Sequence, residues 1–258
     1  METIDQAAGP PQLRDLTSAD ITGALRAGVK DFRTAPAFGL FFGAIFSLIG
    51  IVIFLQLLVW ESTYWVLPIA AGFPLVGPFL AASLYEVSRV LERGEKPDWA
   101  AVIAAPFRQG SRQIQWMAFV SVFFYMVWVY MAHLIFALSF GLSPLTNVTS
   151  SAELLLSSEG ILMIGLGSVI GGGLAVLLFA VSVISIPMLL DRDIDVVTAM
   201  VASFQSVLRN RGPMVLWGLI IAAITGVAMA PLFLGMILAL PVLGHASWHL
   251  YTRAVERG

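Results

Sequence analysis

The fold is decided by residues 212–252, GPMVLWGLIIAAITGVAMAPLFLGMILALPVLGHASWHLYT, a run of 41 residues without Asp, Glu, Lys or Arg. About 20 helical residues suffice to cross the hydrocarbon core of a bilayer, because each residue adds about 1.5 Å. The run is therefore long enough for two crossings, and Pro231 lies where a tight turn would separate them. We predict transmembrane helices near Pro213–Ala230 and Leu232–Tyr251.

Four more uncharged runs precede this one, and each also exceeds the length of one crossing. They cover 34–60, 62–85, 113–152 and 160–190. Only 12% of the residues are charged, against about 25% in soluble domains. In the third run, the polar residues 143–151 favour a single helix followed by an exposed loop. The sequence thus predicts an all-α polytopic membrane protein with six transmembrane helices, the first four near Ala37–Trp60, Tyr64–Tyr85, Ile114–Phe140 and Ile161–Leu190.

The basic residues determine the predicted orientation, since Lys and Arg that flank membrane spans stay on the cytoplasmic side. All 14 of them precede span one, follow span six, or lie between spans two and three or spans four and five. The connections 61–63 and 141–160 and the turn at Pro231 carry none. We therefore expect both termini in the cytoplasm and a multi-pass location in the bacterial inner membrane.

Three segments of the chain share a pattern that suggests an internal repeat. Asp20–Lys30, Asp98–Arg108 and Asp195–Gln205 each have an acidic start, an apolar stripe at helical spacing and a polar end. We predict three tandem units, 18–95, 96–192 and 193–258, each a cytoplasmic amphipathic helix followed by a helical hairpin. The alternative is that amphipathic links arose independently, because any membrane hairpin needs basic flanks.

These units would form one membrane domain, 18–258, preceded by a cytoplasmic tail, 1–17. We expect the amphipathic helices to lie in the headgroup layer, with their apolar faces towards the lipid. The aromatic residues expected at this cytoplasmic interface are Trp99, Phe107, Phe204 and Trp248. Packing beneath the bundle is the simpler role for these helices, and recruitment of a partner is the alternative.

The three histidines of the chain are the main candidates for chemistry. His245 and His249 are four residues apart on span six, so they share a helix face and could bind a metal ion or a haem. His133 should lie near the opposite membrane surface, about 28 Å along span three. The simpler interpretation is that His245 forms an interhelical hydrogen bond and that His249 belongs to the interfacial belt with Trp248 and Tyr251.

Span four is rich in small residues, which allow helix backbones to approach closely. Its spacing includes a Gly-x-x-x-Gly pair and a Ser-x-x-x-Gly pair. We therefore predict that span four is the central helix or a dimer contact, and a pore lining is the alternative. The predicted packing residues are Gly165, Gly167, Ser168, Gly171 and Gly172.

The rest of the sequence argues against an enzyme. The chain has no cysteine, and it lacks a phosphate-binding loop, a hydrolase nucleophile motif and a zinc-protease motif. No charged residue lies in the middle of a predicted span, which removes the usual site for ion coupling. With a net charge of −2, nothing suggests a nucleic-acid partner. We expect no catalytic residue, cofactor or metal, apart from the question of His245 and His249.

Three stretches resemble a family of bacterial integral membrane proteins known as domain of unknown function 2189. They are 31–43 (DFRTAPAFGLFFG), 73–89 (FPLVGPFLAASLYEVSR) and 244–251 (GHASWHLY). The resemblance implies a multi-span membrane protein without an established activity. Some members look to have been labelled as subunit I of a haem-copper oxidase, but three histidines are too few for the haems and copper of that subunit. An accessory or assembly role beside a respiratory complex is the weaker idea that survives.

Two functions from different classes follow. The first is a non-catalytic scaffold, accessory subunit or assembly factor that contacts lipid and either other membrane proteins or further copies of itself. The second is a small permease or channel for an uncharged or lipid-like solute. Haem or metal binding through span six is a third, weaker alternative.

Overall fold

The computed structural model describes residues 11–58, 63–108, 113–141 and 156–256. In these ranges the regular secondary structure is helical, apart from one isolated bridge between the two ends of the chain. The connections predicted at 61–63 and 141–160 lie largely outside the described residues. The helices are α1 Ser18–Thr34, α2 Pro36–Leu58, α3 Thr63–Glu92, α4 Trp99–Ala104, η1 Ala105–Phe107, α5 Ile114–Phe140, α7 Ser158–Ser182, α8 Ser185–Asp191, α9 Val196–Arg209, α10 Arg211–Met229 and α11 Met236–Ala254.

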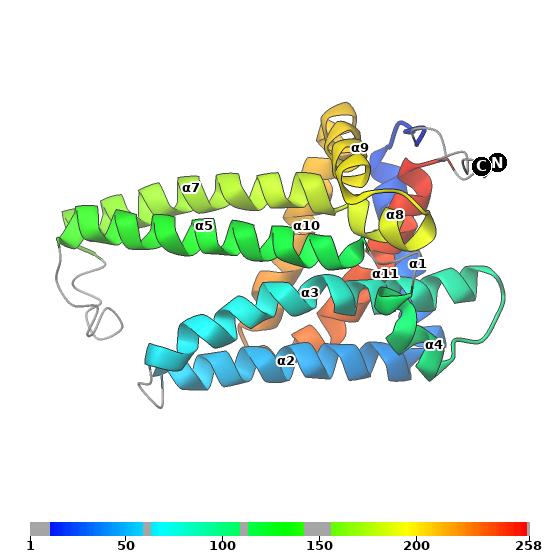
Figure 1. Cartoon of the computed structure of the whole chain (residues 1–258), viewed down its shortest axis with the longest axis horizontal. Helices are drawn as coiled ribbons and strands as arrows, with labels where there is room; N and C mark the ends of the chain where they lie inside the picture. The colour runs from blue at the N-terminus through cyan, green and yellow to red at the C-terminus, as the bar shows by residue number, and fades with distance from the viewer. Residues whose placement is uncertain (1–10, 59–62, 109–112, 142–155, 257–258) are drawn as a thin grey trace, which may run out of the picture.

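Four stretches of helix in the described residues are long and apolar enough to cross a membrane. Their bounds are Pro36–Leu55, Ile114–Phe140, Ser158–Asp191 and Arg211–Met229. α2, α3, α5 and α7 extend side by side away from the end of the molecule that holds both chain termini (Figure 1). At that same end lie α1, α8 and α9 (Figure 1).

The helix at the centre of the packing is α11. It contacts α1, α2, α3, α8 and α10, and ten of its residues are buried. Trp248, Leu250 and Tyr251 are fully buried within it. Span four was predicted to be the central helix or a dimer contact. α7, which begins that span, has mostly exposed side chains and packs against α5, α8 and α9, so it is not the central helix, and the dimer contact stays a prediction.

The close approach to α11 is made by glycines of α1 and α2. A Cβ added at Gly43 would lie 2.4 Å from the carbonyl oxygen of Ile237, and one at Gly28 would lie 2.6 Å from the amide nitrogen of Ala246. At Gly39 an added Cβ would meet side-chain atoms instead, those of the Phe32 ring and of Pro241. Gly28 and Gly43 thus allow backbone to pack against backbone, which is what small residues do between membrane helices.

The glycines of α7 are arranged differently. An added Cβ at Gly171 would meet the ring of Trp128 on α5 at 2.6 Å. At Gly165, Gly167 and Gly172 nothing lies within 4 Å of that position. Of the predicted packing glycines, Gly171 alone is covered by the described part of the chain, and the others face open space.

The three predicted amphipathic segments are helical, but their first turns are stabilised in two ways. Asp98 and Asp195 are N-cap residues whose carboxylates accept from the backbone amides of Ala101 and Thr198. In α1 the N-cap is Thr17, and Asp20 lies three residues inside, where it accepts from the Thr17 amide and hydroxyl. Asp98 and Asp195 are therefore at the N-cap, whereas Asp20 is three residues beyond the N-cap of its helix, so an alignment of the three acids does not align the helix starts.

Span four is broken where the sequence predicts one continuous helix. The Ser203 hydroxyl of α9 lies between Ala180 and Ile184, donating to the carbonyl of Ala180 at 2.7 Å and accepting from the amide of Ile184 at 3.1 Å. It replaces the backbone bond between those two groups. Pro187, with no amide hydrogen, cannot bond to Val183. The helix therefore ends at Ser182 and α8 begins at Ser185.

The four aromatic residues expected at the cytoplasmic interface divide into two kinds. Trp99, Phe107 and Phe204 are exposed, as an interfacial position requires. Trp248 is fully buried and packs against the rings of Tyr85 and Tyr251. It is a core residue and cannot insert into headgroups, because α1 and α3 cover the α11 segment that carries it.

The glycine contacts with α11 give the first testable prediction. Gly43→Ala forces a methyl group against the Ile237 carbonyl, so we expect it to lower the free energy of unfolding in detergent by about 1–3 kcal/mol. Gly172→Ala makes the same chemical change in open space and should not destabilise the protein. Equal losses for the two variants, measured by denaturant titration, would contradict the placement of α2 on α11.

Candidate functional site

A polar cluster lies among α1, α3 and α11 near the end of the molecule that holds the termini. His249 Nε2 is 2.7 Å from Asp31 Oδ2, and His249 Nδ1 is 3.2 Å from Glu92 Oε1. The side chains of His249 and Asp31 are nearly buried, and that of Glu92 is partly exposed. A carboxylate oxygen therefore lies at each ring nitrogen of His249, an arrangement that suits an imidazolium, which donates from both nitrogens.

His245, the other histidine of α11, lies one helical turn before His249 and has a neutral partner. His245 Nδ1 is 2.8 Å from the Ser88 hydroxyl of α3, and both side chains are fully buried. This contact is the interhelical hydrogen bond that the simpler interpretation predicted. It ties α3 to α11 next to the ionic cluster.

His245 and His249 lie on one face of α11, as the spacing predicted, but both contact side chains of other helices. His133 is exposed on α5, far along the chain from both, and contacts the Val129 carbonyl at 2.7 Å. Among the described residues, no group of three or more His, Asp or Glu side chains is arranged to hold a metal ion. A haem or metal coordinated by one ring nitrogen of His249 would have to displace the carboxylate at that nitrogen.

A second buried charge fastens α3 to the segment that follows it. Glu86 is 2% exposed and accepts from Arg89 at 2.7 Å and from Arg108 at 2.9 Å. Arg108 also donates to the carbonyl of Ala101 at 3.0 Å. With two cations on one carboxylate, Glu86 holds α4 and η1 against the end of the first hairpin.

The two chain ends form a third polar structure, here called the terminal clasp, which comprises residues 12–16, 206–210 and 254–256. Leu13 pairs with Val255 in an antiparallel bridge, and the Arg14 amide donates to the carbonyl of Ala254 at 2.8 Å. The Glu256 amide donates to the backbone carbonyl of Gln12 at 3.0 Å. The N-terminal segment is therefore bound along the chain that leaves α11.

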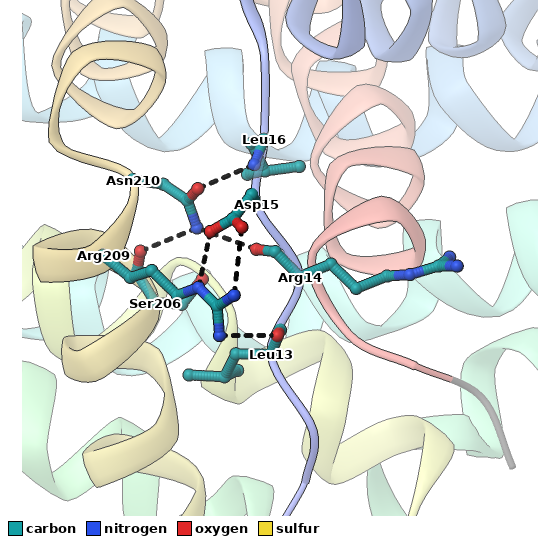
Figure 2. Close-up of polar contacts among 7 residues, drawn as sticks. All are labelled: Leu13, Arg14, Asp15, Leu16, Ser206, Arg209 and Asn210. Carbon is teal, nitrogen blue, oxygen red and sulfur yellow. Dashed lines mark hydrogen bonds and ion pairs between the residues drawn. The ribbon is translucent and has the colours of Figure 1, made fainter.

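The other side of the clasp is the corner between α9 and α10 (Figure 2). Asn210 accepts from the Leu16 amide at 2.7 Å and donates to the Arg14 carbonyl at 3.1 Å. Arg209 contacts both carboxylate oxygens of Asp15, at 2.6 and 3.1 Å, and donates to the Leu13 carbonyl at 2.9 Å. Side chains from residues 209 and 210 thus hold the backbone of the N-terminal segment in place.

The Arg209 guanidinium holds the pKa of Asp15 below its ordinary value of 3.8 through a hydrogen bond and charge attraction. A lowered carboxyl pKa stabilises the folded arrangement above the ordinary value, and that stabilisation is lost as the pH falls through the lowered value. The clasp should therefore be intact at neutral pH. The pair is exposed to solvent, so its strength should also fall with added salt.

The remaining candidate is an apolar groove between α5 and α7, with a volume of about 660 Å³. Gly167, Ser168, Gly171 and Gly172, four of the predicted packing residues, line it. The opposite wall includes Ser121, Tyr125 and Trp128 of α5. Ser168 and Gly172, which line the groove, are exposed, so the groove opens onto the surface of the hairpin.

Sequence reasoning missed most of this polar framework. Residues 11–17 were predicted as part of a tail, although Asn210 at the junction of α9 and α10 could have signalled a polar anchor. Asp31 and Glu92 were not singled out from the sequence. The contact between Asp31 and His249 joins residues 218 positions apart, and no local sequence pattern indicates it.

A family model described as "Predicted integral membrane protein (DUF2189)" matches residues 66–191. The matched range covers most of α3 and continues through α4, α5, α7 and α8. It includes the resemblance segment 73–89, whereas 31–43 and 244–251 lie outside it. No curated protein and no solved structure matches the chain.

The ionic cluster gives a second prediction. His249→Gln removes the ring that contacts both carboxylates and leaves at least one of them without its partner, so we expect a loss of about 3 kcal/mol in unfolding free energy. His133→Gln is the matched control: it replaces an exposed histidine bonded only within its own helix and should change stability by less than about 0.5 kcal/mol. Denaturant titration in detergent measures both. Similar values would show that His249 is not held as described.

The terminal clasp gives a third prediction. The chain has no cysteine, so any disulfide within it must join the introduced cysteines. Bridge partners in an antiparallel pair have Cα atoms about 4.5–5.5 Å apart, within disulfide range. We expect Leu13→Cys with Val255→Cys to cross-link on mild oxidation in native membranes at neutral pH. Leu13→Cys with Val227→Cys, which places the second cysteine on an exposed position of α10, should not. Failure of the first pair to cross-link above the control would refute the clasp.

Proposed function

Because the chain belongs to the DUF2189 family of predicted integral membrane proteins, we propose that it is a non-catalytic, multi-pass protein of the bacterial inner membrane. In this proposal it acts as a scaffold, accessory subunit or assembly factor for another membrane protein. The transmembrane helix of that partner docks in the groove between α5 and α7. A respiratory complex is one setting in which such a subunit would work.

The proposal includes a topology of six crossings with both termini in the cytoplasm. α3 and α11 would cross in addition to the four apolar stretches. α11 is less apolar because it carries His245, His249 and Arg253, but its polar groups are covered by α1 and α3. The basic residues of the described chain gather on the segments at the end with the termini, which supports that end as cytoplasmic.

The observation that carries the partner-docking proposal is the uncovered glycine surface of α7. Glycine weakens a helix by about 1 kcal/mol relative to alanine, so it needs a compensating contact. On α1 and α2 that contact is α11, which lies against the backbone at Gly28 and Gly43. At Gly167 and Gly172 the described chain supplies no such contact.

Lipid contact alone does not require glycines, since any apolar side chain satisfies it. A partner helix does, because close packing and polar contacts drive helix association where there is no hydrophobic difference between lipid and protein. The exposed Ser168 beside the glycines adds a hydroxyl that can bond across such an interface. The same face would serve another membrane protein or a second copy of this chain.

Transport of a lipid-like solute is the second candidate, and one observation favours it. A second apolar groove of about 610 Å³ lies between α7 and α10, and Ala175 of α7 lines both grooves. Its lining includes Phe179, Met214 and Thr225. A hydrophobic molecule could bind there from the bilayer. Reconstitution with a fluorescent lipid tests this candidate, and absence of transfer above empty vesicles would exclude it for that lipid.

Docking on α7 gives the fourth prediction. The double substitution Gly167→Leu with Gly172→Leu fills the groove without touching the interior. The full-length protein would be purified from native membranes in mild detergent, and co-purifying proteins quantified by mass spectrometry. We expect a stoichiometric membrane protein with the wild type and at least about a tenfold loss with the variant, the effect of removing roughly 1.4 kcal/mol.

Val169→Leu is the control on the same helix, at a position that is 74% exposed and does not line the groove. It should retain the partner. Both variants should keep the wild-type melting temperature, which separates lost docking from lost folding. A wild-type protein that is recovered alone and monomeric would contradict the proposal.

A further inference from the structure

The outer face of α1 carries three cations that have no anionic partner in the described chain. Arg26, Lys30 and Arg33 are exposed and lie one helical turn apart, so they form a single stripe. Together with Leu25, Val29 and Thr34 they line a hollow of about 490 Å³. None of the three takes part in an ion pair with a described residue.

The corresponding helices of the other two predicted units differ in this respect. Arg108, just beyond η1, is neutralised by Glu86 at 2.9 Å. Arg209, at the end of α9, is neutralised by Asp15 at 2.6 Å. In α1 the nearby Asp31 points the other way, into the buried contact with His249. The α1 stripe therefore lacks the protein carboxylate that its two counterparts have.

The connection to α2 fixes where this stripe lies relative to the bilayer. α2 begins at Pro36, the first residue of an apolar crossing stretch. Arg33 is three residues earlier, and three residues extend over at most about 11 Å. The headgroup layer on each side of the hydrocarbon is about 5–8 Å thick. Long basic side chains at this level reach lipid phosphates.

We propose that the stripe of Arg26, Lys30 and Arg33 on α1 is a binding site for the headgroup of an anionic phospholipid. The guanidinium and ammonium groups pair with the phosphate, as cations at a membrane surface do. Leu25 and Val29, which line the same hollow, contact the glycerol and upper acyl chain. Because α1 packs along α11, bound lipid would hold the first helix against the core.

The experiment uses the full chain in an uncharged detergent, titrated with phosphatidylglycerol or phosphatidylcholine and followed by native mass spectrometry. Lys30→Gln with Arg33→Gln is the test variant. Arg93→Gln with Lys96→Gln is the control, because it also removes one arginine and one lysine from exposed positions that form no ion pair with a described residue. Melting temperatures without lipid show that both variants fold.

We expect the wild type and the control to bind phosphatidylglycerol, and the test variant to bind it about thirtyfold more weakly, from the loss of two surface cations. Phosphatidylcholine should bind weakly to all three. Equal binding of the two lipids, or equal weakening in both variants, would overturn the site. If inorganic phosphate alone displaced the lipid and raised the melting temperature as much, the ligand would be free phosphate and the lipid assignment would be wrong.

Discussion

Backbone contact between α11 and the glycines of α1 and α2 is the constraint on which the rest of the structure depends. Lipid is as apolar as a leucine side chain, so membrane helices gain little by hiding apolar surface from it. Close packing must hold them together, and Gly28 and Gly43 allow it. With α11 fixed in this way, the polar residues near its C-terminal end meet α1 and α3. His249 and Asp31 can then pair out of water.

Hydropathy and charge predicted the helices well because these properties are local. The bounds of α5 were predicted without error, and those of α2 and α10 within two residues at each end. The break after Ser182 escaped prediction because its cause is a hydroxyl from another helix, Ser203. A sequence pattern shows where a helix can form, but not which neighbour will interrupt it.

Small-residue motifs show the same limit more sharply. Gly39 and Gly43 have the same four-residue spacing as Gly167 and Gly171, and both pairs occur in apolar helices. The first pair packs against α11, whereas Gly167 meets nothing within 4 Å. The spacing states that a close approach is possible. What approaches is decided by the whole fold, as it is for the clasp contact between Leu16 and Asn210, 194 residues apart.

The three predicted units therefore hold unequal positions in the molecule. The third supplies α11, which has its most extensive contacts with α1, α2 and α3 of the first unit. The second supplies α5 and α7, which pack on each other and leave one glycine face uncovered. Glycines at an uncovered surface weaken a helix and gain no packing contact within this protein. A packing contact with another protein would compensate for that loss, which is the physical reason to look for the partner at α7 and not at the buried histidines.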